Sequence, residues 1–468
     1  MIKKREIQKR IESKRAGRKI NQKNTKRINQ ISKQRGSDMV YQLFTTIIHF
    51  FPELFDKIRE IEDYRKGADY KLVELITACI GMFLFKEVSR NAFNNDRQEE
   101  KFKRNYSRMF KMRLPHMDTV DAVMRRLDEN ELEHLKTTMI RTLLVKKTLH
   151  KFRFQGKYFL VAVDGSGVAS YSKKHCDHCL TKTSKNGKTT WFHNVLEAKL
   201  VCSNGFSISM GTEWIENPEG DYKKQDCEQK AFRRLAQKLK ELFPQLPICI
   251  AADGLYPNQT FFSICKNNNW SFIVTFEDGN LPTVWKTVEV LRGITSDNKF
   301  SCTIKQQGKT ISRDYCWLNG IDYRGFLINW IECVETVETD KSKKSSRFVH
   351  ITDHKISRDT AEEISFSGRL RWKIENEGFN TQKNLGYGLK HKYSRVNWLA
   401  AKNYYQCLQI AHLINQLLEL NTRFKEQLKG KITIKHLWKC MIGFLIYGSI
   451  DTEKLSILAQ LRTQVRFE

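Results

Sequence analysis

The sequence predicts a mixed α/β protein: a helical N-terminal region, an α/β core with a β-rich insertion, and helices at the C-terminal end. Three observations predict this class. Apolar residues recur three or four positions apart from Met39 to about Lys151 and again after Thr360, the pattern of amphipathic helices. Two short apolar runs, LVAVDG and CIAADG, end in Asp-Gly and are typical of buried strands. Between the second run and the returning helices, the pattern is that of strands.

The helical region begins after a strongly basic arm. Residues 1–36 contain 14 basic and two acidic side chains, which is +12 of the total formal charge of +29. Apolar residues are sparse there, so we expect a flexible arm that phosphates order, or alternatively a solvated tail without a special role. The helices that follow have basic faces, but no clear helix-turn-helix pattern.

The core is expected to begin with the strand KYFLVAVDGSGV, whose acidic residue Asp164 emerges at its end. A β-hairpin around Ser203-Asn204-Gly205 follows, and then an amphipathic helix that ends near Pro244. A second buried strand ends at Asp253, and one more helix and strand complete the order β, β-hairpin, α, β, α, β. This order, with acidic residues after its first and fourth strands, predicts a ribonuclease-H-like core.

The remaining chain is divided by the same patterns. A strand-rich stretch broken by the charged linker ETDKSKKSSR predicts the insertion, and helix returns from Thr360 to Asn384 and beyond. The expected segments are a basic flexible arm (1–38), a helical, DNA-binding domain (39–152), the first part of the core (153–276), the insertion (277–359), the rest of the core (360–420) and C-terminal helices (421–468).

Composition limits the function class. The 468 residues include 81 Lys and Arg against 52 Asp and Glu, which makes a polyanion, and nucleic acid first of all, the expected partner. An anionic membrane surface is the rival, but no window approaches the roughly 20 apolar residues of a spanning helix, and MIKKREIQKR lacks the apolar core of a signal peptide. Twelve scattered cysteines suggest reduced thiols, so we expect a soluble, cytoplasmic protein.

The stretch RWKIENEGFNTQKN raises the question of whether one of its glutamates is chemically active. At 100° per residue, an α-helix places Arg371 and Gln382 beside Glu375, Lys383 at the edge of that face and Glu377 on the opposite side. An ordinary amphipathic helix with surface charges is the alternative interpretation.

Three carboxylates on three elements, Asp164, Asp253 and Glu375, form a candidate metal site. Adjacent strand ends can hold the two aspartates, and a helix packed across the sheet can bring Glu375 beside them. Hard anionic oxygens with open positions for phosphate and water are what two Mg²⁺ or Mn²⁺ ions require.

Five motifs in this order, VAVDGSG, HCDHCL with NGKTTWFHN, KQDCE, IAADGLY and RWKIENEGFNTQKN, resemble those of the DDE transposases of bacterial insertion sequences. The similarity spans roughly Leu114 to Leu417, and it is to the branch with a β-rich insertion before the glutamate. The resemblance implies a ribonuclease-H-like core with Asp164, Asp253 and Glu375 as Mg²⁺ ligands. It also implies nicking at the element's ends and transfer of the 3′-hydroxyl into double-stranded target DNA by a homo-oligomer that pairs two ends.

In that family an arginine four residues before the glutamate and a lysine seven residues after it hold DNA phosphates. Arg371 matches the first position, whereas the second is Gln382, followed by Lys383, and the tyrosine expected seven residues before Glu375 is Gly368. Arg371 and Lys383 are therefore the candidate DNA-binding residues. A catalytically inactive or domesticated DNA-binding derivative, and a nuclease or resolvase on the same core, are the alternatives.

The stretch CDHC is a second candidate metal site. Cys176 and Cys179 have the C-x2-C spacing of a zinc site, and His193 is a third candidate ligand, with His175 and His178 nearby. The alternative is a pair of reduced thiols and solvated histidines on a loop.

Overall fold

The structure is a computed structural model that describes residues 33–217, 225–294, 297–306, 308–395, 397–428, 432–461 and 465–467. Most of the predicted basic arm, residues 1–32, lies outside the described residues. The chain divides into two units: Met1–Val123 together with Leu417–Glu468, and Met124–Gln416. These boundaries differ from the expected segments, because the C-terminal helices join the N-terminal unit and the helix after Asp128 joins the core.

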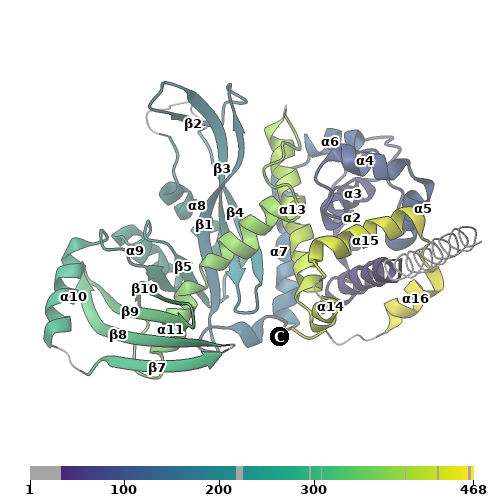
Figure 1. Ribbon diagram of the computed structural model, residues 1–468. Coiled ribbons are helices and arrows are strands. Elements are labelled where there is room, and N and C mark those ends of the chain that lie inside the picture. Colours follow the sequence, from purple (N-terminus) through teal and green to yellow (C-terminus); the bar gives the residue numbers. More distant parts are fainter. Residues whose placement is uncertain are drawn as a thin grey trace, which may run out of the picture. The chain divides into compact units, whose positions relative to one another are not determined.

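The regular elements among the described residues of the first unit are helices, joined by loops, with one isolated β-bridge between Asn421 and Phe467 (Figure 1). Its helices are residues 33–50, α2 (Leu54–Arg59), α3 (Leu72–Leu84), α4 (Arg90–Gln98), α5 (Glu100–Phe110), α6 (Met117–Met124), α14 (Thr422–Gln427), α15 (Ile434–Tyr447) and α16 (Thr452–Gln460). Helix α3 is apolar on nearly every side and is buried along its whole length, so it forms the centre of this unit. The amide of Asn105 on α5 donates to the carbonyl oxygen of Leu445 on α15 at 2.8 Å, which ties the two ends of the chain together.

The second unit is built on one sheet, which has ten strands in the described residues (Figure 1). The strands are β1 (Phe159–Tyr171), β2 (Leu180–Thr183), β3 (Thr189–Val201), β4 (Ser207–Ile215), β5 (Ile248–Ala252), β6 (Ser271–Thr275), β7 (Lys299–Gln306), β8 (Lys309–Tyr323), β9 (Phe326–Thr339) and β10 (Ser342–Thr352). The helical segments are α7 (Glu129–Val145), η1 (His150–Phe152), α8 (Glu228–Leu242), α9 (Gln259–Asn268), α10 (Pro282–Ile294), α11 (Ala361–Arg369), η2 (Ile374–Asn380), α12 (Thr381–Asn384) and α13 (Trp398–Glu419).

The strand order is β2-β3-β1-β5-β6-β10-β9-β8-β7, and β4 also pairs with β3. Strands β1, β5 and β6 are parallel, whereas β3 runs antiparallel to β1. The predicted mixed α/β class and the hairpin around Ser203–Gly205 are confirmed. The short strand β2 was not predicted, because its residues LTKT carry no apolar run long enough to mark a strand.

The predicted insertion is rich in strands and also contains helix α10. Strands β7 to β10 form an antiparallel meander, and β10 joins it to the core by pairing with β6. The insertion therefore continues the core sheet.

Helix α7 packs on β4 through a buried lysine. The Lys136 ammonium is fully buried and donates to Ser209, Thr212 and Gln406, at 2.9, 3.1 and 2.9 Å. Since a buried ammonium without such partners would be strongly destabilising, this network explains why α7 belongs to the sheet's unit. No described helix combines the length and apolar character needed to cross a membrane.

Candidate functional site

The register between β1 and β5 brings the two predicted aspartates to neighbouring positions. The parallel pairing runs from Phe159 opposite Ile248 to Ala162 opposite Ala251. Asp164 and Asp253 each stand two residues beyond that last pair, so both emerge where the parallel strands separate. The prediction that Asp164 ends its strand was wrong: β1 continues to Tyr171, paired only with β3.

The third predicted carboxylate is carried by the π-helical segment η2, which lies against the sheet. A Cβ atom at Gly378 would stand 2.9 Å from Ser207 Oγ on β4 and 3.3 Å from Lys199 Cδ on β3. A larger residue at this position would require the side chains of Ser207 and Lys199 to move, so glycine favours this close approach of helix and sheet. Glu375, three residues earlier, accepts a hydrogen bond from Arg371 Nη1 at 2.8 Å, as the one-turn spacing predicts.

The electrostatics of Asp164 show which charges surround it. Burial and the charge of Glu375 raise the pKa of Asp164 to about 7, with smaller contributions from Glu228 and Asp253, while Arg371 acts in the opposite direction. The structure thus brings all three predicted carboxylates and Arg371 into one electrostatic neighbourhood, in which negative charge exceeds positive charge.

Glu228, at the start of α8, is a fourth acidic residue of this neighbourhood that the sequence did not single out. A Cβ atom at Gly165 would stand 2.6 Å from Glu228 Oε2, so this carboxylate lies directly beside the chain at Asp164. Glu228 Oε1 accepts a hydrogen bond from the Tyr256 hydroxyl at 2.9 Å. Its only signal in the sequence is its place as the last residue of the KQDCE motif.

The π-helical geometry also changes which residue follows Glu375 on its face. A π turn holds one residue more than an α turn. The residue that shares the face of Glu375 two turns later is therefore expected eight positions after it, instead of seven. Gln382 is fully buried and donates to Gln409 at 2.8 Å, so its side chain is held in the protein interior and does not reach the solvent. Burial and Lys390 lower the pKa of Lys383, against the opposing charges of Asp164 and Glu375, which places Lys383 near the carboxylates.

Glu377, two residues after Glu375, has a different partner. It accepts a hydrogen bond from the Lys373 ammonium at 2.5 Å and so forms an ion pair that is separate from the pair of Arg371 and Glu375. This agrees with the prediction that Glu377 faces away from Glu375.

The carboxylates offer the hard oxygen atoms that Mg²⁺ and Mn²⁺ prefer, and their mutual repulsion is what a bound cation would relieve. Their fit to a shared ion is incomplete in this arrangement, because Glu375 is engaged by Arg371. Within the described ranges, one group of three or more ligand atoms lies within metal-binding reach, and it consists of histidines and cysteines.

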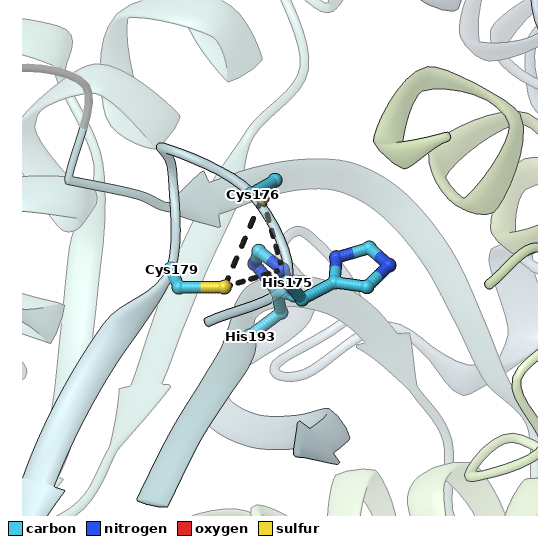
Figure 2. A group of neighbouring side chains, drawn as sticks. All are labelled: His175, Cys176, Cys179 and His193. Carbon is cyan, nitrogen blue, oxygen red and sulfur yellow. Dashed lines mark hydrogen bonds between the residues drawn. The ribbon is translucent and has the colours of Figure 1, made fainter. Parts of the chain in front are cut away.

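That group contains His175, Cys176, Cys179 and His193, one ligand atom of each lying within 4.8 Å of the others. Figure 2 shows the two sulfur atoms and the His193 ring in mutual contact, with His175 beside them. The predicted residues Cys176, Cys179 and His193 therefore come together, and His175 joins them. Burial raises the pKa of Cys176 to about 12 and lowers that of His193 to about 4, so neither group is charged at neutral pH without a bound cation.

A groove of about 630 Å³ lies along β1 and β3, lined in part by Lys182, Lys390 and Lys392. Lys390 is also the basic neighbour of Lys383, so positive charge continues from the groove toward the carboxylates. A separate cavity of about 580 Å³ is lined by both acidic and basic residues. Its charges pair with one another, for example Lys402 with Glu129 at 2.8 Å and with Glu216 at 2.7 Å, which is typical of structural ion pairs.

No protein-family profile and no curated protein sequence matches this chain.

Proposed function

We propose that the protein is a DNA transposase of the DDE type, which nicks the ends of its own insertion element and joins the 3′-hydroxyl to target DNA. The observation that carries the proposal is the convergence of Asp164, Asp253 and Glu375 from two adjacent parallel strands and a helical segment packed on the same sheet. The order β4-β3-β1-β5-β6, with β3 antiparallel, supports a ribonuclease-H-like core.

In this proposal Asp164, Asp253 and Glu375 would hold Mg²⁺ once Glu375 is released from Arg371, and Glu228 would add negative charge beside them. A bound cation supplies polarisation of the phosphoryl group and activation of a water or a 3′-hydroxyl. Arg371 holds Glu375 before DNA arrives. Its guanidinium has the planar set of donors that grips a phosphate in two places, so it can then share its charge with the DNA backbone.

The lysines of the neighbouring groove support a polyanionic substrate. Lys182 and Lys390 are exposed, and Lys392 and Lys383 are partly so, which leaves ammonium groups available to phosphates. Such contacts orient a duplex without reading its sequence. Pairing of two element ends by a homo-oligomer belongs to the same proposal.

The test is cleavage of a duplex that carries the inverted repeats flanking the gene, with Mg²⁺ and the full chain. Asp164→Asn, Asp253→Asn and Glu375→Gln should each abolish cleavage while gel-shift affinity is retained, because the apolar strands still fold. Glu377→Gln, two residues from Glu375 but paired with Lys373, is the matched control and should cleave normally.

The products separate the alternatives. Joining of the cleaved 3′-ends to a second duplex identifies a transposase, and cleavage without joining identifies a nuclease. Wild-type cleavage by Glu375→Gln would refute the assignment of the third carboxylate.

A further inference from the structure

We propose that His175, Cys176, Cys179 and His193 bind one structural zinc ion. This site lies in the loop and strand that follow the carboxylate region of β1, and it does not depend on the proposed function.

The first argument is the spacing of three ligand atoms. The two sulfur atoms are 3.8 Å apart, and His193 Nε2 is 3.4 Å from each of them. A tetrahedral zinc ion with Zn–S bonds of about 2.3 Å and Zn–N bonds of about 2.0–2.1 Å has edges of about 3.8 Å between sulfurs and about 3.5 Å between sulfur and nitrogen. The three atoms therefore already stand at the corners of one face of a zinc tetrahedron. A disulfide would need sulfur atoms about 2.0 Å apart.

The second argument concerns the free nitrogen of His175. Its Nε2 donates to the carbonyl oxygen of Arg395 at 2.8 Å, since a carbonyl can only accept. This bond leaves the lone pair on Nδ1, a buried atom with no hydrogen-bond partner among the described residues. A histidine that donates one ring N–H to a backbone carbonyl and offers its other nitrogen is the usual arrangement of a zinc ligand.

The third argument is that both rings are held in place. Tyr171 stacks on His175 with ring centroids 4.2 Å apart, and Trp398 stacks on His193 at 3.7 Å. Nδ1 of His193 has no hydrogen-bond partner in the described part of the chain, so stacking replaces the usual second bond there. Rings fixed in this way reach the metal with little loss of side-chain entropy.

The ion would join three separate segments: the loop after β1, strand β3, and, through Arg395 and Trp398, the beginning of α13. That loop leads directly into β2, so the ion anchors the base of the β2–β3 hairpin, whose turn carries the exposed residues Lys185 and Lys188. On binding, two thiols become thiolates and release two protons to the solvent.

The experiment begins with the wild-type full chain, purified without added chelator from cells grown with zinc. Elemental analysis should find one zinc per chain, and a mercurial thiol reagent should release it. Replacement by Co²⁺ should produce the thiolate charge-transfer band, and calorimetry of zinc binding in buffers of different ionisation enthalpy should detect about two released protons. Metal-free protein that takes up neither ion, or a disulfide between Cys176 and Cys179, would overturn the proposal.

Variants then test each ligand. Cys176→Ser and Cys179→Ser should lose the metal, and His175→Asn should weaken zinc affinity roughly 100-fold, because one of four metal–ligand bonds is lost. His178→Asn is the matched control, since His178 lies in the same loop but faces Glu216 at 3.6 Å, and it should bind zinc normally. Unchanged affinity in His175→Asn would remove this residue from the site. If the cysteine variants do not fold, X-ray absorption spectroscopy of the wild-type zinc protein provides the test. Two sulfur and two nitrogen ligands would support the proposed site, and any other ligand set would contradict it.

Discussion

Lys383 and Gln382 are neighbours in sequence but occupy opposite environments, because the π-helical segment shifts the face that follows Glu375. Gln382 bonds to Gln409 and His412 in the core, whereas Lys383 shares the field of the carboxylates. On a regular α-helix the two roles would be exchanged. The extra residue in this turn explains why Lys383, rather than Gln382, lies in the field of Asp164 and Glu375.

The two residues should therefore fail in different ways when replaced. Lys383→Ala should slow single-turnover DNA cleavage about 10- to 100-fold, because a charge-assisted contact to the DNA is lost. The free energy of unfolding should change little. Gln382→Ala should lower the free energy of unfolding by about 1–3 kcal/mol, because buried partners are left unsatisfied, and should cleave near the wild-type rate. Single-turnover kinetics and urea denaturation of both variants measure this, and a rate loss confined to Gln382→Ala would contradict it.

A second residue-scale feature is the carboxyl pair Glu87 and Asp96 in the first unit. Burial, followed by the charge of Asp96, raises the pKa of Glu87 from 4.5 to about 7. Because the pKa of Glu87 is higher in the folded state than in the unfolded state, the folded state binds the proton more tightly. The free energy of unfolding is therefore highest below about pH 4.5 and falls as the pH rises toward 7.

Replacement by the neutral amide should remove that dependence. Relative to Glu87→Gln, the wild type should lose about 2 kcal/mol of unfolding free energy between pH 4.5 and 8. This value follows from about 1.4 kcal/mol for each unit by which the pKa is raised, reduced because the side chain is partly exposed to solvent. Urea denaturation of both proteins across this range provides the measurement. Curves that stay parallel would show that Glu87 titrates normally.

At the scale of the element, Gly378 fixes the position of the segment that carries Glu375. Gly378→Ala should cost about 1–3 kcal/mol of stability and should also slow cleavage, because the added methyl group pushes η2 away from β3 and β4. Gly293→Ala in α10 is the matched control: nothing lies within 4 Å of its added Cβ, and helix propensity should favour it by about 0.5–1 kcal/mol. Thermal denaturation and cleavage assays compare the two, and equal behaviour would show that η2 is not held by this contact.

The elements that sequence reasoning predicted best were those with one dominant signal. The apolar run IAA before Asp253 identified β5, and the Asn204-Gly205 turn identified the hairpin. The length of β1 was missed because Gly165, Ser166 and Gly167 do not look like strand residues, although β3 pairs with them. The burial of Gln382 was not predicted, because one value of turn per residue was applied to a segment that does not keep it.

The site shows the same limits. Asp164 and Asp253 were singled out as candidates because each ends an apolar run, and Glu375 because of the residues that flank it on a helix. Glu228 was not singled out, and His175 was noted only as a neighbour of the zinc candidates, since their contacts involve Gly165 and Arg395, residues far away in the sequence. Contacts of this kind come from tertiary packing, which spacing along the chain does not encode.

At the scale of the whole molecule, the formal charge of +29 predicts that a polyanion is attracted to the protein. Residues 1–36 carry 14 basic side chains and so contribute much of this charge. Residues 1–32 lie outside the described part of the chain. Each phosphate contact of a duplex contributes about 0.9 to the slope of log affinity against log salt.

Deleting residues 1–36 should therefore weaken DNA binding and reduce that slope by several units, in fluorescence anisotropy titrations at increasing salt. A second variant that keeps all 36 residues but replaces the basic ones with glutamine separates charge from length, and it should behave like the deletion. An unchanged slope in either variant would show that the arm makes no phosphate contacts.

The pairing of β10 with β6 separates distance along the chain from distance in space. The chain leaves the core after Thr275 and returns beside it, at His350, its antiparallel partner, before continuing to α11 and Glu375. The segment between Thr275 and His350 therefore begins and ends at the same place in the sheet. Its length does not affect the position of Glu375. The exposed β9–β10 turn at Asp340 and Lys341 is accordingly a point where a foreign domain can be grafted while the path to Glu375 stays the same.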